Sequence, residues 1–391
     1  MALSPLVGHR EARRALARAA ATGCLPQSLL VHGPAGIGKE RFGLWLAQLL
    51  VCTGEQPEQE PCGACGPCRW TERLEHPDVH WFFPLPRPEG AGTPDRLRAK
   101  LEEQRAAELQ ARRSHPLYVA QHDRAPAYFL AMVQTLQALA ATRPATGRRK
   151  VFVVGDAEAM VPQESSPEAA NAFLKLLEEP PADTVLVITS SKPGALLPTI
   201  RSRVLPLRLV PLSTPEVEEF LLGAGTPAEQ ATQVARLAEG APGRALRLLP
   251  NAGGTSTAAA RVERGRTLLA AVLSRSATAR LEAAHAEAPS GGRGEFSETL
   301  DAFTAALREL LGTAAGEAGS SAVGEHGALL HRAVQQNRLH PLGIAAALSR
   351  VARARELAAG NVNPQMILAV LLREVEEALG TANERASAHA S

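Results

Sequence analysis

The amino-acid sequence predicts an α/β domain with a parallel sheet, followed by two all-helical regions. Three short apolar runs, at residues 28–32, 150–154 and 184–189, have the composition of buried strands, and helix-favouring stretches separate them. A further strand is expected near residues 204–209. Strands that alternate with helices build a parallel sheet with helices on both faces. Ser165 is expected to cap a helix that starts at Pro167-Glu168. After Pro211 the strand signal ends and only helical patterns follow, with Ser213 or Thr214 expected to cap a helix at Pro215-Glu216 and residues 251–257 expected to be a polar linker.

Composition limits the compartment and the partners. The 391 residues suffice for two or three domains. The formal net charge of +2 is far lower than that of a protein that grips DNA over its whole surface, so any DNA contact should be local or shared with partner subunits. The apolar runs are too short for a membrane span, and residues 1–6 lack a signal-peptide pattern. We therefore expect a cytoplasmic protein without a membrane partner.

Gly33, Gly36, Gly38 and Lys39 form a candidate phosphate-binding loop. Their segment, GPAGIGK, follows the first predicted strand and leads into a predicted helix at residues 40–51. The glycines allow backbone N–H groups to face a phosphate, and the lysine reaches the terminal phosphates of a nucleotide. An ordinary glycine-rich turn is the alternative, which the flanking strand and helix disfavour.

Both positions that should hold magnesium depart from the working pattern. A functional loop has Ser or Thr after the lysine, whereas this chain has Glu40. The second predicted strand should end in an acidic residue, but Gly155 follows it, with Asp156 and Glu158 one and three positions further on. A shift of one residue turns a side chain to the opposite face of a strand. We therefore expect this chain alone not to hydrolyse ATP efficiently, and ATP and magnesium need not bind to it.

Cys52, Cys62, Cys65 and Cys68 follow in a Cys-x9-Cys-x2-Cys-x2-Cys pattern. In a large cytoplasmic chain, such clustering favours a metal over disulfides. Four thiolates suit tetrahedral zinc and leave no open coordination position, so the metal should be structural. A set of buried cysteines and an iron–sulfur cluster are the alternatives. Cys24 stands apart and is expected to be a small buried hydrophobic residue.

Five further motifs, together with the loop and the cysteines, resemble bacterial clamp-loader ATPase subunits of the AAA+ family. They are residues 25–30 (LPQSLL), 76–78 (HPD), 170–181 (ANAFLKLLEEPP), 201–203 (RSR) and 240–246 (GAPGRAL). The RSR motif is similar to the family's Ser-Arg-Cys motif, with Val204 in place of the cysteine, and GAPGRAL is similar to its second sensor. The specific motifs cover about residues 5–250. Residues 258–391 resemble the family only as a helical region with a similar helix start, NVNPQ, at 361–365.

The resemblance implies an α/β AAA+ domain with an inserted zinc module, a small helical lid domain and an all-α collar domain. The AAA+ P-loop domain would span 1–211, with the zinc module at 52–68 and a charged insertion at about 87–127. The lid would span 212–253, and the collar, through which subunits oligomerise, 258–380. Residues 381–391 would form a disordered tail. The family pattern does not require the insertion. We expect its charged stretch, 97–113, to be a solvated helix, with a partner-binding or DNA-binding arm as the alternative.

The altered magnesium positions favour the delta-prime type of subunit over the gamma/tau motor subunits, which keep both motifs. The resemblance then implies a stationary ring member of the DNA polymerase III holoenzyme, which takes part in loading the sliding clamp onto primer–template DNA. Its partners would be the gamma/tau subunits, the delta subunit, the clamp and, through the complex, DNA. Arg203 would be an arginine finger that reaches ATP on a neighbouring motor subunit. A surface ion pair is the alternative role, and Arg201 is an alternative finger.

The candidate nucleotide site, which the resemblance marks as degenerate, comprises Gly33, Gly36, Gly38, Lys39, Glu40, Asp156, Thr189 and Arg244. Arg244 would lie over the chain's own nucleotide, or be structural if none binds. Two other functions stay open. The first is an active gamma/tau-like ATPase in which Asp156 serves magnesium, and the second is a zinc-dependent DNA-binding protein with a vestigial nucleotide fold.

Overall fold

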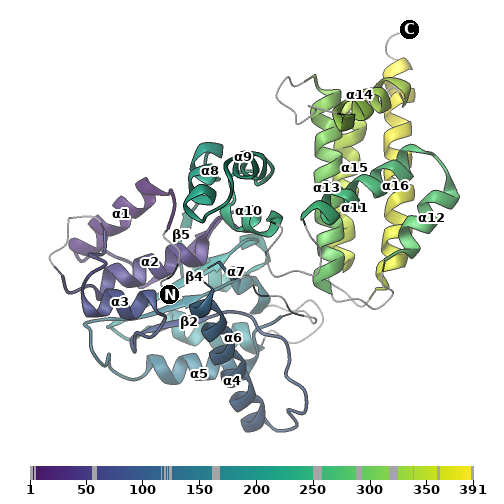
Figure 1. Cartoon of the computed structure of the whole chain (residues 1–391). Helices are drawn as coiled ribbons and strands as arrows, with labels where there is room; N and C mark the ends of the chain where they lie inside the picture. The colour runs from purple at the N-terminus through teal and green to yellow at the C-terminus, as the bar shows by residue number, and fades with distance from the viewer. Residues whose placement is uncertain are drawn as a thin grey trace. The chain divides into compact units, whose positions relative to one another are not determined.

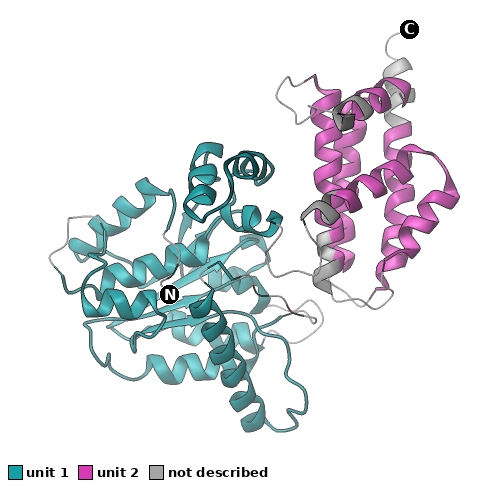
Figure 2. Cartoon of the chain, in the orientation of Figure 1, with its two compact units in different colours: residues 1–120, 126–253 teal, residues 121–125, 254–391 magenta. Residues whose placement is uncertain are grey.

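The structure is a computed structural model of the whole chain. It describes residues 3, 6–54, 60–115, 117, 118, 120, 122, 126–160, 168–249, 258–287, 293–316, 325–337, 339–358 and 362–388. The chain divides into two compact units, one of residues 1–120 and 126–253 and the other of residues 121–125 and 254–391 (Figure 2). The first unit holds the α/β domain and the small helical domain, and the second holds the C-terminal helices.

A parallel sheet forms the centre of the first unit (Figure 1). Its five described strands are β1 (Ser28–His32), β2 (Val79–Phe82), β3 (Lys150–Val154), β4 (Thr184–Ser190) and β5 (Leu205–Arg208), in the spatial order β2-β3-β4-β1-β5. All four pairings are parallel, which confirms the predicted fold class. The sequence pattern did not reveal β2, because a strand of four residues is too short to give a periodic signal.

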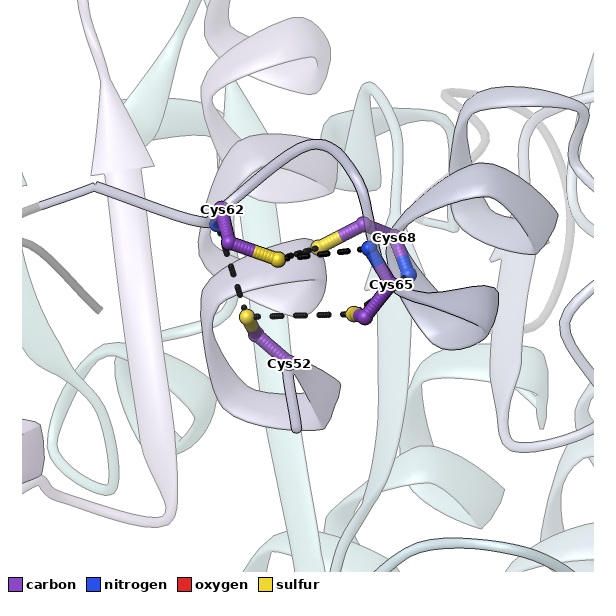
Figure 3. A group of neighbouring side chains, drawn as sticks. All are labelled: Cys52, Cys62, Cys65 and Cys68. Atoms are coloured by element: carbon purple, nitrogen blue, oxygen red, sulfur yellow. Dashed lines mark hydrogen bonds between the residues drawn. The ribbon is translucent and has the colours of Figure 1, made fainter. Parts of the chain in front are cut away.

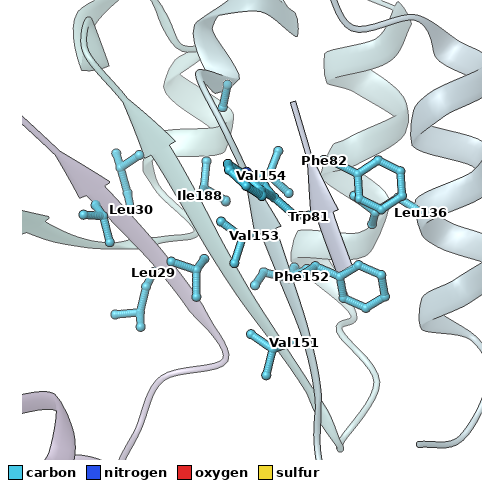
Figure 4. Close-up of a cluster of buried hydrophobic side chains, with 14 of the residues drawn as sticks. Leu29, Leu30, Trp81, Phe82, Leu136, Val151, Phe152, Val153, Val154 and Ile188 are labelled. Carbon is cyan, nitrogen blue, oxygen red and sulfur yellow. The ribbon is translucent and has the colours of Figure 1, made fainter. Parts of the chain in front are cut away.

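The core of this unit lies between the sheet and its helices (Figure 4). Helix α2 (Lys39–Val51) packs against the central strands β1, β3 and β4. The approach is close at Gly43, where an added Cβ would lie 3.0 Å from Val153 Cγ1 and 3.2 Å from Val187 Cγ1. The small residue therefore allows the helix to lie near the sheet, and this contact fixes where both ends of α2 are placed.

Other helices of the α/β domain surround the sheet. They are α1 (Arg10–Ala21), α3 (Gly66–Glu72), α4 (Pro94–Ser114), α5 (Leu130–Ala140), α6 (Glu168–Glu178) and α7 (Pro198–Arg201), with short 3-10 turns η1 (Ala157–Met160) and η2 (Pro193–Ala195). The expected cap of α6 by Ser165 lies outside the described residues, as does the expected linker at 251–257.

Helix α4 corrects the expectation of a solvated insertion. Leu101 is 1% exposed, and it joins the core of the α/β domain. The guanidinium of Arg105 lies 4.7 Å from the ring centre of Phe82, and that of Arg112 lies 4.3 Å from the ring of Trp81. The charged composition misled the prediction because arginine side chains can cover aromatic rings while they remain charged.

The small helical domain has a core of its own. It contains α8 (Thr214–Gly223), α9 (Ala228–Leu237) and α10 (Pro242–Leu248), which pack around Val217, Leu221 and Ala235. Ser213 and Glu216 form a capping box at the start of α8, and the predicted helix start is thereby confirmed.

The second unit is helical throughout its described residues. It consists of α11 (Ala258–Leu273), α12 (Ala277–His285), α13 (Arg293–Ala314), α14 (Glu325–Asn337), α15 (Pro341–Ala358) and α16 (Pro364–Ala388). Its core includes Phe303, Leu307 and Leu372. A tail was expected from residue 381, but the backbone of α16 continues as a helix past this point. Residues 389–391 lie outside the described part. No helix in the described part of the chain has the length and apolar character that crossing a membrane requires.

Candidate functional site

The loop from Gly33 to Lys39 connects β1 with α2 at the carboxyl edge of the parallel sheet. Gly38 caps α2 with φ +93°, a left-handed conformation that glycine adopts without a side-chain clash. Lys39 is 6% exposed, and its Nζ donates to Pro34 O at 3.0 Å and to Ser191 Oγ at 2.8 Å. Burial lowers the pKa of Lys39. The lysine is thus bound to groups of this chain.

Helix α10 begins directly on this loop. Gly243 N donates to Gly36 O at 2.7 Å, and a Cβ on Gly243 would lie 3.0 Å from the same oxygen. Arg244 turns away to Glu239, with 2.6 Å between Nη1 and Oε2. The α10 cation near the loop is Arg247, whose Nη2 would be 3.5 Å from a Cβ on Gly36. Arg247 was not among the predicted site residues, although its position one turn after Arg244 could have indicated it.

Glu40 occupies space that a side chain at position 155 would need. A Cβ on Gly155 would lie 2.1 Å from Glu40 Oε1 and 2.7 Å from its Cδ. Burial and the neighbouring Asp156 raise the pKa of Glu40 to about 7. The two departures from the magnesium-binding pattern are therefore sterically complementary, because the glycine makes room for the glutamate.

The remaining polar groups at the ends of the strands bind one another. Thr189 is fully buried, and its Oγ1 accepts from Asp156 N at 3.0 Å. Glu158 Oε1 accepts from Ser191 N at 2.9 Å. Burial and the charge of Glu158 raise the pKa of Asp156. Among the described residues, Glu40, Asp156 and Glu158 do not form a group of three or more converging metal ligands.

Arg203 lies on a turn that two buried side chains anchor, Ile200 and Val204, which are 0% and 8% exposed. Its Nη2 lies 2.8 Å from Glu178 Oε1, and its Nη1 donates to Thr199 O at 2.9 Å. The side chain of Arg203 is 35% exposed and that of Glu178 is 48% exposed. The guanidinium is therefore partly exposed and held by Glu178 and Thr199. Arg201, at the end of α7, is exposed as well.

The four clustered cysteines converge, as their spacing predicts (Figure 3). Their sulfur atoms all lie within 4.8 Å of one another, and the Cys62–Cys68 and Cys52–Cys65 pairs are each separated by 3.9 Å. Four sulfurs at zinc–thiolate distance would be about 3.8 Å apart. The cluster is consistent with a structural metal, and zinc suits it best.

Local structure places each sulfur of this module. Cys52 caps the C-terminus of α2, and the side chain of Cys65 caps the N-terminus of α3 by accepting from Cys68 N at 3.4 Å. Backbone N–H groups of Cys62 and Cys65 donate to the sulfurs of Cys52 and Cys62, respectively. Such donors stabilise thiolates. Cys24, expected to be buried, is exposed instead.

Known proteins resemble the first unit. A profile of the family described as "DNA polymerase III, delta subunit" matches residues 8–213. The DNA polymerase III subunit delta' of Pseudomonas aeruginosa is 36% identical over 228 residues, which are 56% of this chain and 54% of that protein. The delta' subunit of Bacillus subtilis is 28% identical over 51% of this chain and 46% of that protein. The gamma/tau subunit of Mycobacterium tuberculosis H37Rv is 26% identical over 54% of this chain and 29% of that protein.

The fold and the site define a class of protein, namely a parallel α/β domain with a glycine-rich loop between β1 and α2 and an added four-cysteine module. The profile covers more than half of the chain, and three delta' subunits each match 51–56% of it. The chain belongs to the delta' family of DNA polymerase III clamp-loader subunits. The alignments span about half the length of the curated delta' relatives.

Proposed function

We propose that this chain is a stationary, non-hydrolysing ring member of a DNA polymerase III clamp loader. The observation that carries this proposal is the packing of Glu40 beside Gly155. These two residues stand at the two positions that would hold magnesium in a working site, and the Glu40 side chain fills the space that Gly155 leaves. Efficient phosphoryl transfer requires a metal that neutralises the phosphates. The chain would work in the cytoplasm as part of the holoenzyme, with gamma/tau and delta subunits as neighbours and the sliding clamp and primer–template DNA as the objects of the complex.

Arg203 is the group that this subunit would contribute to chemistry. Its anchored turn and exposed guanidinium suit an arginine finger, which stabilises the charge that develops on the transferred phosphate of a neighbour's ATP. Glu178 neutralises Arg203 in the isolated chain. A triphosphate carries more charge than one carboxylate and offers several oxygens to the planar donors, so it would displace Glu178. Arg244 pairs with Glu239 and would have a structural role.

Zinc would be held by Cys52, Cys62, Cys65 and Cys68. The sulfurs match its tetrahedral geometry and fill all four positions, so the ion would join α2 to α3 and take no part in catalysis.

The collar would join the subunits. Among its described residues, Leu342 is 71% exposed and Met366 and Val370, one turn apart on α16, are 65% and 48% exposed. Exposed apolar side chains in a helical unit suit contact with other collars.

The proposal is tested by reconstituting the full-length chain with gamma/tau and delta subunits. Clamp- and DNA-stimulated ATP hydrolysis is compared for wild type, Arg203→Ala and Arg201→Ala. We expect a loss at one motor site for Arg203→Ala only. Equal losses in both variants would indicate a general charge effect, and full activity of Arg203→Ala would exclude the finger.

Turnover by the isolated chain separates the proposal from the gamma/tau-like alternative. We expect negligible ATP hydrolysis by the wild type and also by Glu40→Thr, because the variant still lacks an acidic residue at position 155. Magnesium-dependent turnover at the rate of a motor subunit would contradict the proposal.

A further inference from the structure

The insertion helix α4 brings a cation to the altered phosphate site. Arg112 Nη1 lies 4.0 Å from Glu40 Oε2, and Arg112 Nη2 lies 2.8 Å from Glu108 Oε1. The Arg112 side chain is 16% exposed and the Glu108 side chain 8% exposed. Because Glu108 lies one turn earlier on the same helix, it orients the guanidinium towards the end of α2.

Two aromatic side chains, Trp81 in β2 and Phe83 directly after it, hold Arg112 in place. Its guanidinium carbon lies 4.3 Å from the ring centre of Trp81 and 4.5 Å from that of Phe83. Residues two apart on an extended chain point to the same side, so Trp81 and Phe83 form one surface. An arginine stacked on two rings and bound to a carboxylate is a fixed charge.

The charges that surround Glu40 come from several elements. On α2 its neighbour is Lys39, which is already bound to Ser191 and Pro34. Asp156 follows β3, with Glu158 in η1, and both add negative charge. The Glu40 side chain is only 24% exposed, and a carboxylate that is largely removed from water is costly without a counter-charge. In a working P-loop a divalent cation, held by the residue after the lysine, supplies the positive charge at this place.

We infer that Arg112 replaces the divalent cation of the phosphate site, as a resident counter-charge for the Glu40 carboxylate that fills the space beside Gly155. Helix α4 then supplies the positive charge from within the chain, and the site does not depend on magnesium. This role concerns the chain's own site, and it holds whether or not Arg203 acts on a neighbour.

Thermal unfolding of the full-length chain tests this role. All three tryptophans, Trp45, Trp70 and Trp81, belong to the first unit, so tryptophan fluorescence reports the unfolding of that unit. The variants are Arg112→Met, Glu40→Gln and the double variant, each measured at about pH 8, with and without millimolar magnesium chloride and with potassium chloride at equal ionic strength. Arg105→Met is the matched control, because Arg105 also stacks on a ring, and it forms an ion pair with Glu102.

We expect Arg112→Met to lower the unfolding temperature by about 5 °C, and magnesium to recover part of this loss. The wild type and Arg105→Met should not respond to magnesium. Glu40→Gln should reduce the penalty of Arg112→Met to the part that comes from the Glu108 and ring contacts, and it should abolish the response to magnesium. The cycle isolates the Glu40–Arg112 pair, since the contact between Arg112 and Glu108 is lost equally in Arg112→Met and in the double variant.

Four results would overturn the inference. They are an unchanged unfolding temperature for Arg112→Met, additive effects of the two substitutions, equal stabilisation of wild type and Arg112→Met by magnesium, and failure of both Arg112→Met and the double variant to fold. If only Arg112→Met fails to fold and the double variant folds, the inference is supported, because removal of the Glu40 charge has then removed the need for Arg112.

Discussion

The two ends of α2 differ in the side chains that they place around a possible metal site. At its N-terminus, Glu40 and Gly155 stand at the positions where a working site would hold magnesium, and protein side chains fill the space. At its C-terminus, Cys52 joins three other cysteines whose sulfur atoms have the spacing of a tetrahedral metal site. If the phosphate site no longer holds a cation, as we propose, the same helix can still carry a structural metal site, since the two sites depend on different local side chains.

The largest effect should come from the C-terminal end of α2. Cys52→Ser removes one of four ligands, and we expect it to abolish stoichiometric zinc and destabilise the first unit by several kcal/mol, because binding of a structural metal contributes to folding. Elemental analysis and thermal unfolding measure the two effects. Cys24→Ser is the control, because Cys24 is exposed and apart from the cluster. Wild-type protein that contains iron and sulfide would replace the zinc interpretation, and protein without any metal would contradict it.

A smaller effect is expected at the N-terminal end of α2. Gly155→Asp restores the acidic residue of a working site, but its Cβ would lie 2.1 Å from Glu40 Oε1. We expect a loss of about 1–3 kcal/mol from this overpacking, measured by denaturant unfolding.

Combining Gly155→Asp with Glu40→Ala should recover part of that stability, because the smaller side chain vacates the space. If Gly155→Asp is as stable as the wild type, the steric complementarity of the two positions is wrong.

The third prediction concerns pH. The pKa of Glu40 is raised to about 7 by burial and by Asp156, while Arg112 and Lys39 act in the opposite direction. The folded state therefore holds a proton on Glu40 that the unfolded state has released, so wild-type stability falls as pH rises towards 7. Relative to Glu40→Gln, we expect a loss of up to about 1.4 kcal/mol per pH unit between about pH 4.5 and 7. Denaturant unfolding across this range measures it, and a constant difference between the two proteins would contradict it.

The features that could be predicted from the sequence are those that depend on residues close together in the chain. The parallel sheet, the convergence of the cysteines and the cap at Ser213 all follow from short-range patterns. The contacts that the sequence did not reveal join segments far apart in the chain. Arg112 meets Glu40, and Arg203 meets Glu178, only because the sheet brings their elements together.

The character of α4 was mispredicted for a related reason. Its composition is that of a solvated helix, and only the fold shows that Arg105 and Arg112 cover Phe82, Trp81 and Phe83. Hydrophobic periodicity does not record an arginine that packs through its guanidinium plane.

The smallest effect on stability should come from Arg203. Its pair with Glu178 is partly exposed, and surface ion pairs contribute about 0–1 kcal/mol. We therefore expect Arg203→Ala and Glu178→Gln to unfold within about 0.5 kcal/mol of the wild type, in contrast to substitutions at either end of α2. In the reconstituted complex the two variants should separate. Arg203→Ala should lower ATP hydrolysis, Arg203→Lys should restore little of it because lysine lacks the planar set of donors, and Glu178→Gln should preserve it, because the finger remains and loses only a competitor for phosphate. A Glu178→Gln variant as inactive as Arg203→Ala would show that the ion pair itself, rather than the free guanidinium, is what the neighbouring site requires.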